Sequence, residues 1–239
     1  MVTLTARGAL IAKYLGLLLC LSLPMSAAAG PVNLITNSDF SGGYVGFTTD
    51  YIFTADGGAD DDLWDPGVFG IDDTAAGRHP YWVTTGDHTS GSGAMMLVNG
   101  QTASASTVWK QSVSVAPDTT YFFEAWAMDL CCNALMPVPF EPPSLSFWIN
   151  GFQVGSSLTG STGAWSGLSN TWNSASASLA TLEIRNGSTI YSGNDFALDD
   201  LFLGTESSLN PAPEPASMLL LGTGLIGVAR AARARRRRA

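Results

Sequence analysis

The sequence predicts an all-β domain, a sandwich of two packed sheets, between a short apolar segment at each end of the chain. Three observations lead to this prediction. The region between the ends is rich in Gly, Ser, Thr, Trp and Tyr, its apolar and polar residues alternate along short runs, and turn-forming residues recur between the runs. The roughly 180 residues of this region are enough for one domain with a sizeable core.

The first 29 residues have the three parts of a secretory signal peptide. Arg7 and Lys13 supply a basic start, residues 14–23 an apolar stretch, and residues 27–29 a small-residue cleavage site. Cleavage there would remove Cys20 with the signal. The residue directly after the cleavage site is Gly30 and not the cysteine that a lipoprotein would require. The sequence therefore predicts an exported protein.

Eight short runs have the residue pattern of β-strands. Around Leu145 and Phe147, for example, apolar side chains alternate with polar ones, so the strand has one buried side. Asn150 and Gly151 follow this run and tolerate positive φ, which predicts a tight hairpin turn. Residues 42–80 are rich in Gly and Asp and predict surface loops. The predicted strands are 32–35, 81–85, 94–98, 107–115, 120–128, 144–149, 177–185 and 195–203.

The charge of the exported part is strongly negative. The whole chain has a net charge of -9, but eight of its eleven basic residues lie in the two terminal segments. Between them only Arg78, Lys110 and Arg185 remain, against nineteen acids, so the formal charge is 3 - 19 = -16. Phosphate backbones need clustered Lys and Arg, so this composition argues against nucleic acid as a partner.

The C-terminal part of the chain predicts a membrane segment after a linker. Residues 205–215 are polar and contain prolines, which favour an extended, accessible chain. The apolar residues 216–229 would make a helix of about 21 Å, short against a hydrocarbon core of ~30 Å. The arginines within residues 230–238 would hold that end in the cytoplasm.

Pro213-Glu214-Pro215, the apolar run with its glycines and the arginine-rich end together resemble the PEP-CTERM sorting signal of Gram-negative bacteria. The resemblance implies that an exosortase, a membrane-embedded protease, reads Pro213, Glu214 and Pro215 and passes the protein to the cell surface. Residues 216–239 would then be a transient transmembrane helix and tail. A plain single-span anchor is the alternative.

Residues 33–40 and 193–201 resemble the opening and closing segments of galactose-binding-like jelly rolls, the fold of many carbohydrate-binding modules. The resemblance extends over the domain at residues 30–204. It implies a β-sandwich in which the first and last strands lie side by side, and many such folds hold a structural calcium ion there.

Three aspartates are the candidate calcium ligands. Asp199 and Asp200 lie on the predicted closing strand and Asp39 in the opening segment. Adjacent residues of a strand point to opposite faces, and Asp199 shares the parity of Leu201, so Asp199 is expected to point inward. Ser41 stands where related jelly rolls often have an acid. A solvated aspartate pair is the alternative interpretation.

Exposed aromatic rings are the usual platform for a sugar. Trp165 and Trp172 lie in Gly- and Ser-rich segments that predict loops, and with Trp82 they are the candidate ligand-binding residues. Trp64 and Tyr81 are further candidates. For any single Trp, packing in the core or under a loop is the alternative. The sequence places three tryptophans within predicted strands and so in the core, Trp109, Trp126 and Trp148.

The exported region has two cysteines, Cys131 and Cys132, adjacent in sequence. In an oxidising compartment the sequence leaves three alternatives for these cysteines: a vicinal disulfide between them, disulfides to another chain, or two reduced thiols. A metal site would need more soft ligands than this pair. A structural role is expected.

Signals of catalysis are few. Neither Gly-x-Ser-x-Gly nor His-Glu-x-x-His occurs, and His79, Asp87 and His88 have no recognisable nucleophile beside them. The expectation is a non-enzymatic surface or extracellular-matrix protein that associates with exopolysaccharide. A displayed glycan hydrolase that uses two carboxyl groups, and a purely structural biofilm component, are the alternatives.

Overall fold

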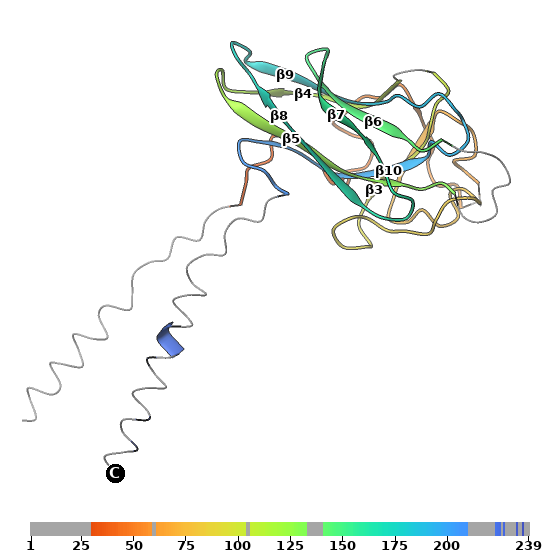
Figure 1. Ribbon diagram of the computed structural model, residues 1–239. Coiled ribbons are helices and arrows are strands. Elements are labelled where there is room, and N and C mark those ends of the chain that lie inside the picture. The colour runs from red at the N-terminus through yellow and green to blue at the C-terminus, as the bar shows by residue number, and fades with distance from the viewer. Residues whose placement is uncertain are drawn as a thin grey trace, which may run out of the picture. The chain divides into compact units, whose positions relative to one another are not determined.

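Ten β-strands form two sheets that pack face to face, so the fold is the jelly-roll sandwich that the sequence predicts (Figure 1). In this computed structural model the described residues are 30–58, 61–103, 106–132 and 141–209, with 223–225, 227, 233 and 236 of a C-terminal helix. Residues Pro31–Asn210 make up one compact unit. The predicted signal peptide lies outside the described residues.

The six-stranded sheet and the four-stranded sheet each combine strands from distant parts of the chain. The larger has the order β1-β2-β3-β10-β5-β8 and the smaller β4-β9-β6-β7. Strands β1 and β2 run parallel, and the other pairs are antiparallel. The larger sheet contains β1 (Ile52–Phe53), β2 (Val68–Asp72), β3 (Met95–Asn99), β10 (Phe196–Gly204), β5 (Thr120–Asp129) and β8 (Ser166–Asn173). The smaller contains β4 (Ser106–Ser114), β9 (Leu179–Asn186), β6 (Ser144–Ile149) and β7 (Phe152–Thr159).

Six of the eight predicted strands are confirmed, as β3, β4, β5, β6, β9 and β10. Residues 32–35 and 81–85 form no strand. Within the predicted loop region 42–80, the structure has β1 and β2. β7 and β8 lie at sheet edges, and most side chains of β7 are exposed. Val154 and Leu158 of β7 share one face and pack on the main core, but the strand is short of large apolar residues, so its alternation is weak.

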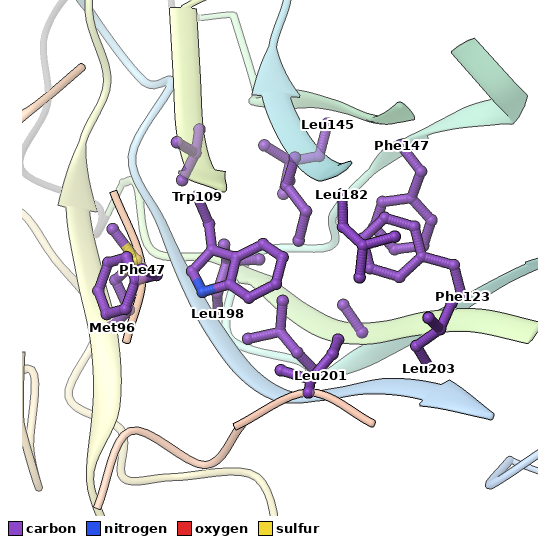
Figure 2. Close-up of a cluster of buried hydrophobic side chains, with 14 of the residues drawn as sticks. Phe47, Met96, Trp109, Phe123, Leu145, Phe147, Leu182, Leu198, Leu201 and Leu203 are labelled. Carbon is purple, nitrogen blue, oxygen red and sulfur yellow. The ribbon is translucent and has the colours of Figure 1, made fainter. Parts of the chain in front are cut away.

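The main core fills the space between the sheets. Trp109 is fully buried and stacks at 6.4 Å from Phe47, while Phe123 of one sheet stacks at 4.3 Å on Phe147 of the other. Figure 2 shows these rings together with Leu198 and other aliphatic side chains in the interior. Burial of such large side chains contributes about 1.5–3 kcal/mol each, so this layer stabilises the sandwich.

A second apolar cluster covers the outer side of the larger sheet. Met95 and Leu97 of β3 and Met128 of β5 point away from the main core and contact Leu63 and Trp82 from the long loops between β1 and β3. These loops therefore pack on the sheet. Their apolar residues are spaced too irregularly to show a strand or helix period, so the sequence did not reveal this layer.

The opening segment lies against the closing strand, as the jelly-roll resemblance implies. Leu34 donates its backbone N–H to the carbonyl of Leu203 at 2.8 Å. Asn33 donates through Nδ2 to the carbonyl of Leu201 at 2.8 Å and accepts from the N–H of Leu203 at 3.0 Å. The two ends of the domain thus meet at one edge of the core.

The first residues of the predicted linker 205–215 are attached to the sheet. The carboxylate of Glu124 in β5 is fully buried and accepts from the hydroxyls of Ser207 and Ser208, from the N–H of Ser208, and from the hydroxyl of Ser169. Burial raises the pKa of Glu124, but these donors outweigh it and hold the pKa below its usual value. We call this contact the C-terminal clasp.

Candidate functional site

Loops at one end of β3 and β10 enclose an aromatic pocket of about 230 Å³. Its walls come from three parts of the chain: the loops on either side of β2, the end of β3, and the loop that leads into β10. The lining residues are Trp64, Pro66, His79, Tyr81, Asn99, Tyr191, Gly193 and Asp195. We call this cavity the aromatic pocket.

Stacked rings form one wall of the aromatic pocket. The ring of His79 stacks at 5.2 Å on Trp64 and also at 5.2 Å on Trp82. Trp82 is buried, whereas Trp64 is 48 % exposed and Tyr191 is 65 % exposed. Rings held in a stack lose little entropy when a ligand binds, so this wall is prepared for a flat apolar surface.

Asp195 places a buried carboxyl in the aromatic pocket. Its Oδ2 accepts from Nε1 of Trp82 at 2.9 Å and its Oδ1 from the N–H of Gly100 at 3.3 Å. Burial raises the pKa of this carboxyl to about 7. The two hydrogen bonds lower the pKa but do not offset the burial, and the negative charge of nearby Asp129 raises it further. Asp195 is the single carboxyl among the lining residues.

His79 is neutral at pH 7, because burial lowers its pKa to about 4. Its Nδ1 accepts from the backbone N–H of Tyr81 at 3.3 Å. In a neutral imidazole whose Nδ1 accepts, Nε2 carries the proton. His79 therefore has one donor available besides its ring face.

Asn99 contributes an acceptor without a partner. Its Nδ2 donates to the carbonyls of Leu63 at 2.8 Å and Trp64 at 3.0 Å, which fixes the orientation of the amide. Its Oδ1 is buried and has no hydrogen-bond partner. A buried unpaired acceptor costs about 1–3 kcal/mol, which a donor on a ligand would offset.

A second cavity, of about 240 Å³, brings the three predicted metal ligands together. Asp39, Asp199 and Asp200 line it with a fourth acid, Asp87, which sequence reasoning did not select as a ligand. We call this cavity the acidic hollow. Its other lining residues are Ser41, Thr89, Ser90, Gly93 and Ala94.

A β-bulge in β10 overturns the expected orientation of Asp199. The pairing with β5 shifts between Asp199 and Phe202, and Asp200 has φ of 46°. One extra residue inverts the alternation, so Leu201 packs in the main core while Asp199 accepts from the N–H of His88 at 2.9 Å. Asp200 also contacts His88, through Nδ1 at 2.7 Å, so both aspartates reach one loop.

The carboxyls of the acidic hollow differ in their hydrogen bonding. Burial raises the pKa of Asp199 to about 7, while the N–H of His88 lowers it and the charge of Asp200 raises it further. Asp87 accepts from the N–H of Gly93 at 2.7 Å and from Ser90 at 2.9 Å. These donors outweigh its burial and lower its pKa to about 2. Within the described part of the chain, no group of three or more His, Cys, Asp and Glu has the arrangement of a metal site.

The structure does not gather the three predicted ligand-binding tryptophans into one site. Trp82 is buried behind His79, and Trp172 is half-buried in β8 at 6.2 Å from Tyr121. Trp165 is half-buried against the second apolar cluster. Trp64 and Tyr81, the further candidates, do line the aromatic pocket, while sequence reasoning missed Tyr191 and Asn99, because neither lies in a motif.

Trp109 is in the core as predicted, but Trp126 and Trp148 are on the outer faces of their sheets. Trp126 stacks at 3.8 Å on His88, and Trp148 lies under the guanidinium of Arg185 at 4.1 Å. Both are half-buried. Each strand offers two faces, and the alternation that buries Leu145 and Phe147 already places Trp148 on the opposite face, which the assignment to the core overlooked.

Cys131 and Cys132 are joined to each other as a vicinal disulfide at the end of β5. Cys131 is buried and donates its N–H to Asp129 at 3.0 Å. Burial raises the pKa of Asp129 to about 6, although this bond and the one from Thr162 lower it. The disulfide therefore lies next to the buried carboxyl of Asp129, just after the end of β5.

Known proteins resemble this chain in two different ways. Residues 211–238 match the model of the PEP-CTERM protein-sorting motif. The CBM22-1 xylan-binding domain of Paenibacillus barcinonensis Xyn10C is 15 % identical over 76 % of this chain and 100 % of its own, with a TM-score of 0.45. TmCBM61, solved with β-1,4-galactotriose, is 12 % identical over 73 % and 99 %, with a TM-score of 0.43. A family 16 carbohydrate-binding module is 16 % identical over 72 % and 99 %, with a TM-score of 0.40.

At such TM-scores and identities, the structural matches say nothing about a ligand of this chain. No curated protein matches the chain by sequence.

Pro213, Glu214 and Pro215 lie outside the described residues, as does most of the predicted span 216–229. Where the structure describes the chain, it contains no helix with the length and apolar character to cross a membrane. By its sequence, the chain ends in a PEP-CTERM sorting motif, the mark of an exported protein that an exosortase processes.

Proposed function

We propose that this protein is displayed at the cell surface or in the extracellular matrix and binds carbohydrate without catalysis, through the aromatic pocket. The observation that carries the proposal is the combination of exposed rings and inward polar groups in one cavity. Trp64 and Tyr191 offer apolar faces, while Asn99 and Asp195 offer hydrogen-bonding groups. Sugars need both, because one face of a pyranose is apolar and its rim is polar.

Several features of the aromatic pocket favour binding over hydrolysis. Glycoside hydrolysis commonly uses two carboxyls about 5–10 Å apart. The lining of the pocket supplies one, Asp195. The acidic hollow has four carboxyls but no aromatic side chain among its lining residues. A hydrolase would therefore have its acids in one cavity and its sugar platform in another.

The direct test is saturable binding of the full chain, purified in detergent, to an array of glycans. We expect Trp64→Ala to weaken binding about 10-fold or more, because aromatic stacking carries much of the affinity of such sites. Phe152→Ala is the matched control, since Phe152 is 77 % exposed and lies outside the pocket. Equal loss in both variants, or no saturable binding at all, would contradict the proposal and favour a purely structural role. Release of reducing sugar from a bound glycan would favour the hydrolase.

We also propose that the exosortase cleaves the chain close to Pro213-Glu214-Pro215 and that residues 216–239 are absent from the mature protein. The match to the sorting motif supports this proposal. Mass spectrometry of the C-terminus of the surface-exposed protein, from its native host, tests it. An intact arginine tail on that protein would leave the plain-anchor alternative.

A further inference from the structure

The unused polar groups of the aromatic pocket are mainly hydrogen-bond acceptors. Oδ1 of Asn99 has no partner, and the orientation of its amide is fixed by two carbonyls on the other side. Asp195 adds a carboxyl whose oxygens meet only the donors of Trp82 and Gly100 among the described residues. No Lys or Arg lines the cavity. A ligand that satisfies this set must donate more hydrogen bonds than it accepts.

The aromatic rings of the same cavity favour positive charge. Trp64, Tyr81 and Tyr191 line it around Asp195, and Trp64 lies 6.0 Å from Tyr81. The face of an aromatic ring attracts a cation by about 0.5–2 kcal/mol, most when the cation is desolvated. The formal charge of -16 between the terminal segments draws cations toward the whole domain.

From these contacts we infer that the aromatic pocket binds the protonated amino group of an amino-sugar unit in a glycan. This inference rests on the carbohydrate binding proposed above and names its chemical class. An ammonium group has three donors and no acceptor, so one ammonium can donate to both Asn99 and Asp195, whereas the single O–H of a hydroxyl can donate to only one of them. The pyranose ring that carries it would stack on Trp64.

The size of the cavity favours a single sugar unit over a larger ligand. Its volume of about 230 Å³ is below the ~300 Å³ at which pockets for drug-sized ligands begin. A lysine side chain would supply the same ammonium but lacks a flat C–H face for Trp64. With Nδ1 of neutral His79 accepting from Tyr81, Nε2 carries a proton that has no acceptor among the described residues and would be donated to a neighbouring hydroxyl of the sugar.

Binding of a cation should also change the protonation of Asp195. The titratable groups near this carboxyl are Asp129 and His79, and neither supplies a positive charge at pH 7. An ammonium beside Asp195 would favour its ionised form, so binding at pH 6 should release a proton from the protein. A neutral sugar gives no such release.

The test compares four probes by calorimetry on the full chain in detergent at pH 6: β-1,4-linked tetramers of glucosamine, N-acetylglucosamine and glucose, and an Nα-acetyl-lysine amide. We expect the glucosamine tetramer to bind about 10-fold or more tightly than the other three, with proton release. Asp195→Asn keeps the shape of the side chain and should remove both the preference and the proton release. Phe152→Ala should change neither.

Each other outcome overturns a different statement. Binding of the acetylated or glucose tetramer as tight as that of glucosamine, and dependent on Trp64, overturns the ammonium inference and leaves carbohydrate binding in place. Equal binding of the lysine derivative overturns the choice of an amino sugar. If no tetramer binds, the ammonium inference is wrong, and the glycan array described above decides whether the proposed carbohydrate binding is wrong as well. Should Asp195→Asn misfold, Tyr191→Ala replaces it, since Tyr191 is largely exposed.

Discussion

The aromatic pocket and the acidic hollow each contain an aspartate, Asp195 and Asp199, whose pKa is raised to about 7, but the hollow also contains Asp87, whose pKa is lowered. In the pocket, Asp195 is buried with two donors and its pKa rises to about 7. In the hollow, Asp87 is also largely buried, but Ser90 and Gly93 donate to it and its pKa falls to about 2. The comparison teaches that a carboxyl stays charged where its hydrogen-bond donors outweigh the cost of burial, and becomes neutral where burial outweighs the donors.

The largest expected effect concerns Asp195. The pKa of Asp195 is about 7 in the folded protein, against an ordinary value of 3.8 in the unfolded chain. Between these pH values the folded protein therefore binds more protons than the unfolded chain. Its stability falls as the pH rises from about 4 to 7. At about 1.4 kcal/mol per pH unit, full ionisation costs on the order of 4 kcal/mol. Asp195→Asn should remove this cost, so urea unfolding should show the variant more stable at pH 8 and similar at pH 4. A constant difference across this range would contradict the assignment.

Calcium should act on the acidic hollow alone. The described carboxyls are not arranged as a metal site in this structure, so we propose, as the jelly-roll resemblance implies, that Asp39, Asp199 and Asp200 move together to bind Ca²⁺ there. At a Ca²⁺ concentration 100-fold above Kd, the folded state gains about 2.7 kcal/mol, seen as a rise in Tm. Asp200→Asn should abolish the rise, whereas Asp118→Asn, outside the hollow, should keep it. A rise of equal size in both variants would place the ion elsewhere, and no rise in the unaltered protein would end the calcium proposal.

Asp87 should stabilise its loop through its hydrogen bonds. Asp87→Ala leaves the donors of Ser90 and Gly93 without a partner, which lowers the free energy of unfolding by about 1–3 kcal/mol. Urea unfolding at pH 7 without calcium measures this change. A variant as stable as the unaltered protein would mean that water replaces the carboxylate at no cost.

The smallest effect on stability is expected at Trp64. Its ring is 48 % exposed and stacks on His79, so Trp64→Ala should lower the free energy of unfolding by about 1 kcal/mol or less. The loss of glycan binding in this variant would then be a loss of contact with the ligand. A much larger destabilisation would show that Trp64 mainly holds the loops on the sheet.

The strands with regular apolar alternation could be predicted from the sequence, because burial between two sheets imposes the period. The resemblance of residues 33–40 and 193–201 also predicted correctly that the two ends of the domain meet. It placed Asp39 beside Asp199, and the structure does bring them to one cavity. The inward orientation predicted for Asp199 was wrong, because a bulge at Asp200 inserts a residue that the sequence does not mark.

The aromatic pocket could be predicted only in part. Trp64 and Tyr81 are conspicuous by residue type, but their partners Asn99 and Tyr191 come from segments far apart in the chain. What joins them is the second apolar cluster, in which residues such as Leu63 fasten long loops to the sheet. These contacts depend on the three-dimensional path of the loops, and neither strand nor helix periodicity encodes that path.

The C-terminal clasp has a consequence for the lifetime of the mature protein. Exopeptidases remove residues from a chain end only while that end is unfolded. Because Ser207 and Ser208 are bound to the buried carboxylate of Glu124, trimming from a newly cut end should stall just after them. The clasp would thereby protect β10, whose loss would remove the centre of the larger sheet, from gradual erosion outside the cell.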